Sequence, residues 1–321
     1  MPDAASRTGS RIGAAARVTL GYTLFVILFG AVVRITGSGA GCGQHWPTCN
    51  GEIAHLPQSL ETAIELTHRV TSGGALIAVL VLAVLAVRAR PAGDRVRSAA
   101  YAAVALMIVE ALIGAALVLY ELVGGNASVG RAVVMPLHLV STYALTATLT
   151  LAACWSEGSP AARSESARIS GFWVGALALV LVSATGALTA LGDTVFPPSA
   201  GSLAGRLLED QGAGATFLQR LRIVHPVLAV LAALGLVRHA LYFTSQPRTR
   251  LPARAVVGIA LFQLLAGVAN VLLSAPGWLQ VVHLALALAL WISYVTLAAF
   301  AREPRRAEAL GVRADQGLAS G

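Results

Sequence analysis

Four of the seven histidines stand inside long apolar segments, and they decide which chemistry the chain could carry. These four are His68, His138, His225 and His283. A single histidine on an apolar helix is more often a packing residue than a ligand. Four of them at similar depth in membrane-spanning segments are costly and indicate a bound partner. Paired neutral imidazoles are typical axial ligands of haem in a helical bundle, and no carboxylate or thiolate cluster accompanies His225 and His283 to favour zinc there.

The two halves of the chain differ next to these histidines. Glu65 lies three residues before His68, so both share one face of a helix, whereas Arg222 precedes His225 at the matching position. A carboxylate beside a haem ligand can accept protons or stabilise developing positive charge, which a purely electron-transferring haem does not need. The alternative is that Glu65 only pairs with Arg69. The asymmetry predicts a fixed cofactor in one half and a reacting group in the other.

Arginines near the outer helix ends are candidates for binding haem propionates, because a guanidinium pairs with a carboxylate through two parallel hydrogen bonds. They are Arg34, Arg69, Arg131, Arg220 and Arg222. The alternative for each is a position at the membrane interface, with the charged head group in water. The remaining histidines are expected to be solvated or interfacial: His45, His55 and His239.

Cys42 and Cys49 lie in the first long loop, in the run Cys42-Gly-Gln-His-Trp-Pro-Thr-Cys49. An oxidising exterior favours a disulfide there. Closing so short a loop would stabilise the fold by roughly 2–3 kcal/mol in the chain-entropy model. The pair is either a structural bridge or a redox dithiol that passes electrons to the site below, and the sequence leaves both open.

The elements that hold these residues must be membrane helices. Of 321 residues, 56% are hydrophobic and only 12% are charged, whereas a soluble domain carries about a quarter charged residues. This composition excludes an ordinary cytosolic globule, a disordered protein and a nucleic-acid binder with a solvated basic face. Although the net charge is +8, we therefore expect the lipid bilayer, and no nucleic acid, as the partner.

Eight apolar segments are long enough to cross a hydrocarbon core of about 30 Å. They are residues 17–37, 64–87, 98–120, 133–155, 171–191, 219–243, 254–274 and 279–300. These runs are too long and too uniformly apolar for barrel strands. We therefore expect an all-α integral membrane protein whose eight transmembrane helices form two pseudo-symmetric four-helix bundles.

The two bundles correspond to an internal repeat. Glu110-Ala-Leu-Ile-Gly114 resembles Gln263-Leu-Leu-Ala-Gly267, and the paired histidines recur at similar offsets, which predicts a pseudo-two-fold axis along the membrane normal. The expected organisation is an N-terminal tail, an N-terminal half with a long outer loop, a linker, a C-terminal half and a C-terminal tail. Their residues are 1–16, 17–155 with loop 38–63, 156–170, 171–300 and 301–321.

The arginines predict the orientation. All 23 basic residues are arginine, and 17 of them fall on the side of the N-terminus. Because cytoplasmic loops carry an excess of basic residues, both termini are expected in the cytoplasm. The tails 1–16 and 301–321 and the outer loop 192–218 carry no motif that assigns a role.

The run Gly30-Ala-Val-Val-Arg34-Ile-Thr36-Gly37-Ser38-Gly39, followed by Cys42, Trp46-Pro47 and Cys49, resembles the beginning of haem A synthases. The likeness continues through Glu65-x-x-His68-Arg69 and the single histidines at 138, 225 and 283. It covers about residues 17 to 300, and it is the ordered combination that is specific. In that family the fold is a pseudo-symmetric eight-helix bundle.

The resemblance implies that His225 and His283 are axial ligands of a permanent haem b in the C-terminal half. It implies that His68 and His138 surround a substrate haem O, with Glu65 as the catalytic carboxylate. Cys42 and Cys49 match the loop cysteines of many bacterial members. The implied reaction oxidises the C8 methyl group of haem O to a formyl group by successive hydroxylations, giving haem A for terminal oxidases.

Further partners follow from this reading. The implied location is the bacterial cell membrane, with haem O synthase as the expected supplier. The sequence does not identify the electron donor or acceptor or the source of the inserted oxygen. It also leaves open whether the protein forms a homo-oligomer. Two alternatives remain: a b-type dihaem carrier that exchanges electrons with quinol, and a non-catalytic haem-handling or oxidase-assembly protein.

Overall fold

The computed structural model describes residues 4–53, 56–156, 167–198 and 202–301, and this part of the chain is helical without a β-strand. The tail 302–321 and most of the expected linker, residues 157–166, lie outside the described residues, as does His55. Eight helical segments there are long and apolar enough to cross a membrane. This confirms the all-α class and the count of spans expected from hydropathy.

The observed helices start and end within a few residues of the expected segments, apart from an earlier start of the first. They are α1 (Ala4–Ile35), α2 (Leu60–Ala89), α3 (Arg95–Leu119), α4 (Val129–Ser156), α5 (Ala167–Val195), α7 (Phe217–Leu221) with α8 (Val224–Leu241), α9 (Arg250–Leu272) and α10 (Gly277–Ala301). Two further elements lie in the long loops, namely the 3-10 turn η1 (Ser38–Ala40) and α6 (Leu203–Gln211). Helix α1 begins at Ala4, before the apolar run, and the alanines at 14–16 favour helix in the part of this extension next to the run.

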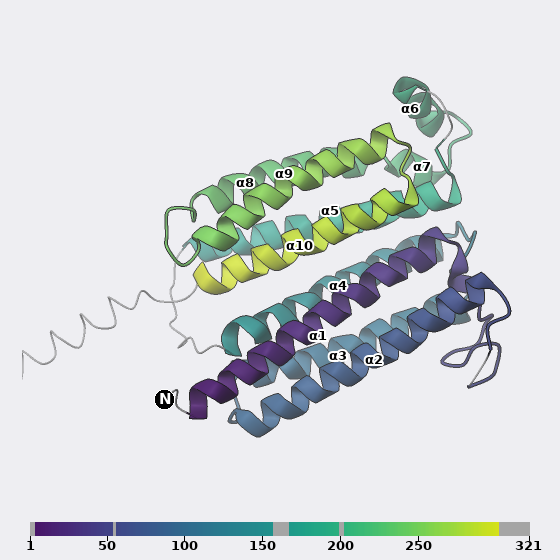
Figure 1. Cartoon of the computed structure of the whole chain (residues 1–321). Coiled ribbons are helices and arrows are strands. Elements are labelled where there is room, and N and C mark those ends of the chain that lie inside the picture. The colour runs from purple at the N-terminus through teal and green to yellow at the C-terminus, as the bar shows by residue number, and fades with distance from the viewer. Residues whose placement is uncertain (1–3, 54–55, 157–166, 199–201, 302–321) are drawn as a thin grey trace, which may run out of the picture.

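The first four helices pack around one another in a ring, in which α1 and α3 each contact α2 and α4 (Figure 1). The second group repeats this order, since α5 and α9 each contact both α8 and α10. Helices α4 and α1 contact α10, and α4 contacts α5, which joins the two groups. The neighbours are those that a duplicated unit predicts, while the pseudo-two-fold axis itself stays a prediction.

A proline fixes where the sixth span is interrupted. Pro226 has no N–H and its ring clashes with the carbonyl group four residues earlier, so it fits best in the first turn of a helix, although Pro136 lies inside α4 without ending that helix. Helix α7 therefore ends at Leu221, and α8 begins at Val224. The interruption places His225 in the first turn of α8.

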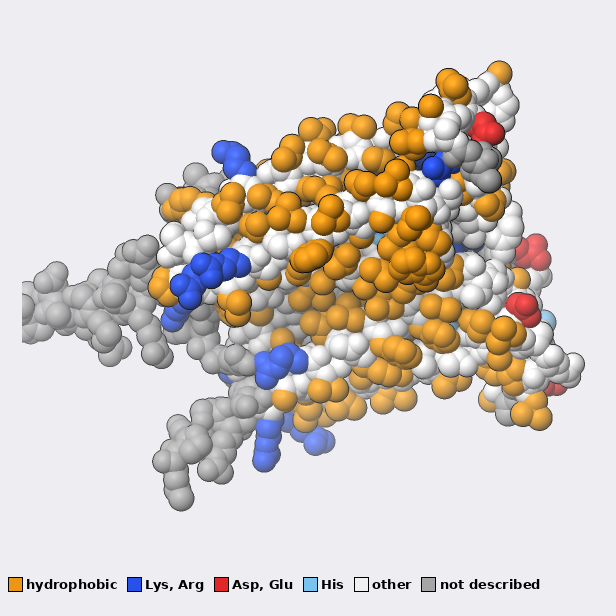
Figure 2. Space-filling view, turned by 45° about the horizontal axis from the view of Figure 1, so that its top comes forward, with side chains coloured by type: hydrophobic (Ala, Val, Ile, Leu, Met, Phe, Trp, Pro, Cys, Tyr) orange, Lys and Arg blue, Asp and Glu red, His pale blue; other side chains and the backbone are white. Residues whose placement is uncertain are grey.

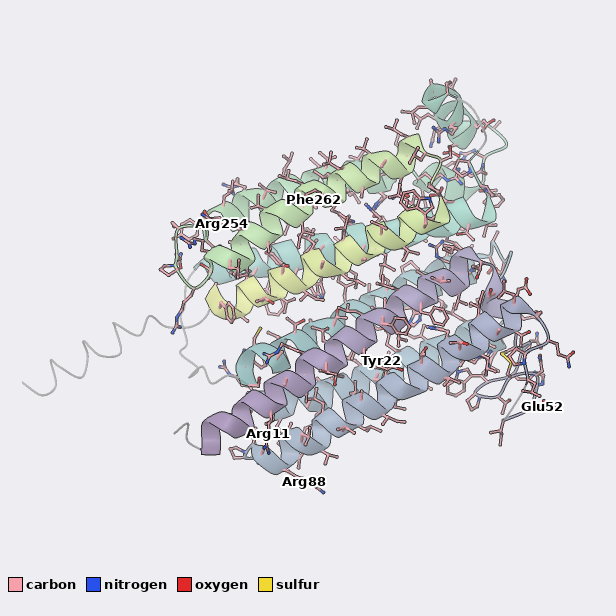
Figure 3. All side chains as sticks on the ribbon, viewed as in Figure 1. Arg11, Tyr22, Glu52, Arg88, Arg254 and Phe262 are labelled. Carbon is pink, nitrogen blue, oxygen red and sulfur yellow. A yellow bond between two sulfur atoms is a disulfide. The ribbon has the colours of Figure 1, made fainter. Side chains whose placement is uncertain are left out.

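The outside of the molecule is apolar along its length and charged at its ends. Figure 2 shows hydrophobic side chains over the middle, arginines at one end and acidic side chains at the other. Arg11, Arg88 and Arg254 lie at the end where α1 begins, Glu52 lies at the opposite end, and Phe262 points outward between them (Figure 3). This distribution is that of a bundle surrounded by hydrocarbon.

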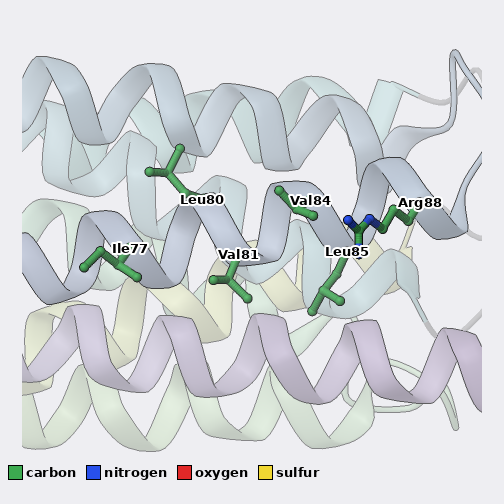
Figure 4. A pocket seen from close by; sticks show the side chains of 6 residues that line it. All are labelled: Ile77, Leu80, Val81, Val84, Leu85 and Arg88. Atoms are coloured by element: carbon green, nitrogen blue, oxygen red, sulfur yellow. The ribbon is translucent and has the colours of Figure 1, made fainter.

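A shallow groove on α2 belongs to the same apolar outside. It is lined by Ile77, Leu80, Val81, Val84, Leu85 and Arg88 (Figure 4). Five of these six side chains are aliphatic and exposed. Hydrocarbon chains of lipid satisfy such a surface, so the groove indicates membrane contact and no separate binding site.

Candidate functional site

The C-terminal pair of histidines faces one another across the second group of helices. His225 of α8 and His283 of α10 have ring centroids 6.3 Å apart, with ring planes at 85°. Two imidazoles bound to one metal ion through nitrogen bonds of about 2 Å have ring centres about 6 Å apart. The separation of His225 and His283 is therefore compatible with two axial ligands of one iron atom.

Glycines allow the neighbouring helices to approach these rings. A methyl group added at Gly186 of α5 would lie 2.9 Å from Cε1 of His225, and one at Gly267 of α9 would lie 3.3 Å from Cε1 of His283. Gly30 of α1 stands in the same relation to His68, at 3.1 Å from its Cε1. Three of the four histidines thus lie against a glycine of the preceding odd-numbered span, a signal that the sequence analysis missed.

The polar partners of the C-terminal pair are neutral. Nδ1 of His225 lies 3.1 Å from the carbonyl oxygen of Val182, and a ring that donates there leaves Nε2 available as a ligand. Nε2 of His283 lies 3.1 Å from the amide nitrogen of Gln263. Neither ring has a carboxylate beside it among the contacts of the described residues.

The N-terminal pair has an acidic neighbour. His68 lies on α2 and His138 on α4, two helices of the first group. Nδ1 of His138 lies 3.0 Å from Oε2 of Glu110 of α3. Thr142 donates a 3.0 Å hydrogen bond to Oε2 of Glu110, and Ser141 donates to its Oε1. The sequence analysis noted Glu110 only as part of the repeat, so its place beside His138 is a finding of the structure.

Glu65 is buried at the outer end of α2, with only 3% of its surface exposed. Arg69 forms an ion pair with its Oε1 one turn later, so the contact expected under the simpler alternative is present. The backbone N–H of Cys42 donates a 2.8 Å hydrogen bond to Oε2 of the same carboxylate. Both carboxylate oxygens are therefore held, and the loop takes part in holding them.

The first outer loop is fixed against α2 by several contacts. Cys42 and Cys49 form a disulfide, which confirms the predicted pairing. Arg69 donates 2.5 Å hydrogen bonds to the carbonyl oxygens of His45 and Thr48. A methyl group on Gly41 would lie 2.6 Å from the backbone of Glu61, so only glycine allows this close approach. The disulfide loop thus covers the outer end of the span that carries Glu65 and His68.

Each arginine predicted to bind a propionate already contacts protein groups. Arg34 reaches from α1 into the second group of helices, where it donates to Thr194, Gln280 and the carbonyl of Ala190. Arg222 pairs with Asp193 and Asp210, and Arg220 donates to backbone carbonyls of its own loop. Arg131 is buried and donates to Gly124 and Asn126, yet its Nε has no partner in the described part of the chain.

Two of the histidines set aside in the sequence analysis can be placed. His45 is exposed in the outer loop, as expected. His239 is half-buried near the end of α8, where its ring packs 4.7 Å from that of Phe172 and 5.4 Å from that of Phe243. His239 is therefore a packed interfacial residue at the end opposite the histidine pairs.

The residues fit haem better than another metal centre. Buried ring nitrogens of three of the four paired histidines, His68, His138 and His283, have no hydrogen-bond partner among the described residues, and neither does Nε2 of His239. No group of three or more histidine, cysteine, aspartate or glutamate side chains that could hold a metal ion is found there either. Paired imidazoles without further ligands match the axial donor set of a haem, whose own nitrogens supply the remaining bonds.

The sequence is similar to those of several known proteins. Two proteins from two strains of Thermus thermophilus, each named protoheme IX farnesyltransferase, are 44% identical over 300 residues, 92% of this chain. The chain spans about half (49%) of their length. A protein named heme A synthase from Bacillus cereus strain AH187 is 43% identical over 97 residues, which are 30% of this chain and 31% of that protein.

The resemblance to haem A synthases drawn from the motifs is thus confirmed by a relative of that name. A family model described as cytochrome oxidase assembly protein matches residues 15–295, which contain both histidine pairs, six of the eight spans in full and most of the first and last spans. The chain therefore belongs to the COX15-CtaA family.

Proposed function

We propose that the protein oxidises the C8 methyl group of haem O to a formyl group and so makes haem A for terminal oxidases. The observation that carries this proposal is the buried carboxylate of Glu65, held by Arg69 and the Cys42 N–H one turn before His68. The matching position before His225 is Arg222, which pairs with Asp193 and Asp210. We therefore place the catalytic site in the N-terminal half only.

The two pairs have different roles in this proposal. His68 and His138 hold the substrate haem O, and His225 and His283 are the axial ligands of a permanent haem b. A haem held by the C-terminal pair would supply one-electron transfer. Gly186 and Gly267 keep the flanking helices close to the rings of that pair, which fixes their orientation.

The reaction removes four electrons and adds one oxygen atom. Counted with water as the oxygen donor, the first hydroxylation breaks one C–H bond, forms one C–O bond and releases two electrons and two protons. The second hydroxylation does the same, and the resulting geminal diol loses water to leave the formyl group. The protons need a base, and the electrons need an acceptor, which we take to be a membrane electron carrier.

Glu65 is the residue suited to this oxidation. Its negative charge lies in a buried environment, where it would stabilise positive charge that develops on the substrate as the methyl group is oxidised. The same carboxylate can take a proton released there. Arg69 and the Cys42 N–H hold the carboxylate in place before the substrate arrives, so little reorganisation is needed.

Farnesyl transfer is the second candidate, because the Thermus relatives carry that name. Transfer from a prenyl diphosphate generally requires Mg²⁺ bound by carboxylates and phosphates. The sequence has five aspartates, at 3, 94, 193, 210 and 315, none within four residues of another. Asp193 and Asp210 both pair with Arg222. With only half of those relatives matched, we assign the farnesyl step to a partner that supplies haem O.

The proposed setting is the cell membrane of a bacterium, with both termini in the cytoplasm and the histidine pairs near the outer surface. The start of α1 and the end of α10 lie at the same end of the bundle, where arginines gather (Figures 1 and 2). The dihaem carrier and the non-catalytic assembly protein predict the same setting, but neither uses Glu65.

Haem analysis separates these functions. The protein is produced with and without a haem O synthase, and its haems are extracted and identified by chromatography and mass. The synthase predicts haem b together with haem O, hydroxylated haem or haem A, and haem A only when haem O is supplied. Haem b alone under both conditions would favour the carrier, and a farnesylated product without a haem O synthase would favour the transferase.

A further inference from the structure

The N-terminal and C-terminal halves differ in charge behind one histidine of each pair. Glu110 of α3 and Gln263 of α9 occupy matching places in the two similar runs that end in Gly114 and Gly267. Each contacts a histidine of the following span: Glu110 Oε2 lies 3.0 Å from His138 Nδ1, and Gln263 Nε2 lies 3.1 Å from His283 Nε2. The N-terminal half thus has a carboxylate, Glu110, at the position where the C-terminal half has an amide, Gln263.

The carboxylate of Glu110 is held by hydroxyl groups. Thr142 donates to Oε2 at 3.0 Å and Ser141 donates to Oε1, both from the turn that follows His138. The Glu110 side chain is only 13% exposed, and no arginine contacts it among the described residues. Its charge is therefore directed at the imidazole and is not neutralised by an ion pair with a guanidinium group.

The position of Glu110 favours one ring nitrogen of His138 as a metal ligand, because its Oε2 lies 3.0 Å from Nδ1 although the two atoms form no hydrogen bond. A carboxylate at Nδ1 favours the proton on that nitrogen, which leaves Nε2 as the ligand and makes the imidazole a stronger electron donor. Gln263 approaches His283 at Nε2 and carries no charge. The pair of residues therefore distinguishes the two haem sites by orientation and by charge.

We propose that Glu110 is a positioning residue of the N-terminal site, which orients His138 with Nε2 toward the bound haem and lowers the reduction potential of that haem relative to the C-terminal one. The identity of the occupant as haem O rests on the proposed function. The positioning role needs only that a haem binds His138. A carboxylate close to an axial histidine, as Oε2 of Glu110 is to Nδ1 of His138, stabilises the higher charge of the oxidised iron.

The test is a redox titration of the purified, haem-loaded protein followed by absorbance. The two haems are assigned by repeating the titration in His283→Ala, in which only the N-terminal haem remains. Glu110→Gln keeps the size of the side chain and one acceptor oxygen for Ser141 or Thr142, but removes the charge. We expect the midpoint potential of the N-terminal haem to rise by at least about 59 mV. For a one-electron couple this corresponds to at least a tenfold fall in the ratio of oxidised to reduced haem at a fixed potential. The C-terminal midpoint should stay unchanged.

Two matched variants guard against a merely structural role. Gln263→Glu should lower the midpoint of the C-terminal haem and leave the N-terminal one unchanged. Glu110→Asp, which keeps the charge, should retain a midpoint closer to wild type than Glu110→Gln. A structural contact between α3 and α4 would change thermal stability in these variants without separating the midpoints in this way.

The proposal is overturned if Glu110→Gln keeps full haem content with an unchanged N-terminal midpoint, or if both midpoints move together. It is also overturned if wild type binds no haem at His138. If Glu110→Gln loses its N-terminal haem, Gln263→Glu decides alone, and an unchanged C-terminal midpoint there rejects the charge effect. Failure of the proposed function looks different, because midpoints would still shift in a protein that never converts haem O.

Discussion

The backbone N–H of Cys42 donates a 2.8 Å hydrogen bond to Oε2 of Glu65, so the disulfide loop directly holds the buried carboxylate of α2. The two residues are 23 positions apart in the chain. If the Cys42–Cys49 bridge serves to position Glu65 through this link, that role requires no electron transfer. The link also makes the loop part of the candidate site.

Replacing both Cys42 and Cys49 with serine tests whether the bridge acts as a structural staple. Loss of the closed loop should lower the free energy of unfolding by roughly 2–3 kcal/mol, and activity should be recoverable at low temperature. Thermal melting and turnover of the purified protein are the measurements. Normal melting and haem loading with slow turnover would instead indicate a redox relay. Wild-type melting with intact turnover would remove both roles.

Gly41→Ala tests the contact between the loop and α2 without touching the disulfide. The added methyl group would lie 2.6 Å from the backbone of Glu61, so the loop must move away and weaken the Cys42–Glu65 hydrogen bond. Overpacking of this kind costs about 1–3 kcal/mol. The matched control is Gly125→Ala, whose methyl group meets nothing within 4 Å in the described part of the chain. Equal turnover and melting of the two variants would contradict this account.

Gly30→Ala tests the close approach of α1 to His68. Its methyl group would lie 3.1 Å from Cε1 of the ring, so the imidazole must shift and haem O should bind less well. Gly114→Ala is the control, because no atom of the described residues lies within 4 Å of its methyl group. We expect a lower haem O content in Gly30→Ala only, measured by extraction. Unaltered haem O content in both variants would show that His68 needs no fixed position.

His225→Ala and His283→Ala test the assignment of the permanent haem. Each variant removes one of two proposed axial ligands, so the protein should insert into the membrane but lose most of its b-type absorbance. The spectrum of the purified protein and its haem-to-protein ratio are the measurements. A normal low-spin spectrum with full haem content in His283→Ala would make the assignment of the C-terminal site wrong.

The fold was largely predictable from the sequence, because a membrane restricts what an apolar run can form. Eight spans, their limits to a few residues and the pairing of Cys42 with Cys49 follow from hydropathy and from the compartment. The interruption before His225 was missed, although Pro226 signals it. Helix α6 was missed as well, because a short polar helix in a loop carries no hydropathy signal.

The candidate site was predictable only in part. Histidines at equal depth stand out in an apolar sequence, and His225 and His283 do lie face to face. The contacts of Glu110 with His138 and of Arg34 with the second group of helices depend on how separate helices cross. No periodicity within one helix contains that information. The alignment of Glu110 with Gln263 was visible, but only the structure shows that both face a histidine.

Glu65→Gln tests most directly the claim that this protein is an enzyme acting on haem O. The variant keeps the size of the side chain but removes the charge, and its single amide oxygen can accept from only one of the two donors, Arg69 and the Cys42 N–H. The exposed Glu61→Gln one turn earlier is the matched control. The measurement is the haem profile of each purified protein produced with a haem O synthase. We expect haem O or a partly oxidised form to accumulate in Glu65→Gln, while the content of haem b stays unchanged. The content of haem A should be at least about tenfold lower than in wild type, which corresponds to a barrier higher by roughly 1.4 kcal/mol. Unchanged haem A in Glu65→Gln would show that Glu65 is only the ion-pair partner of Arg69 and would contradict the account.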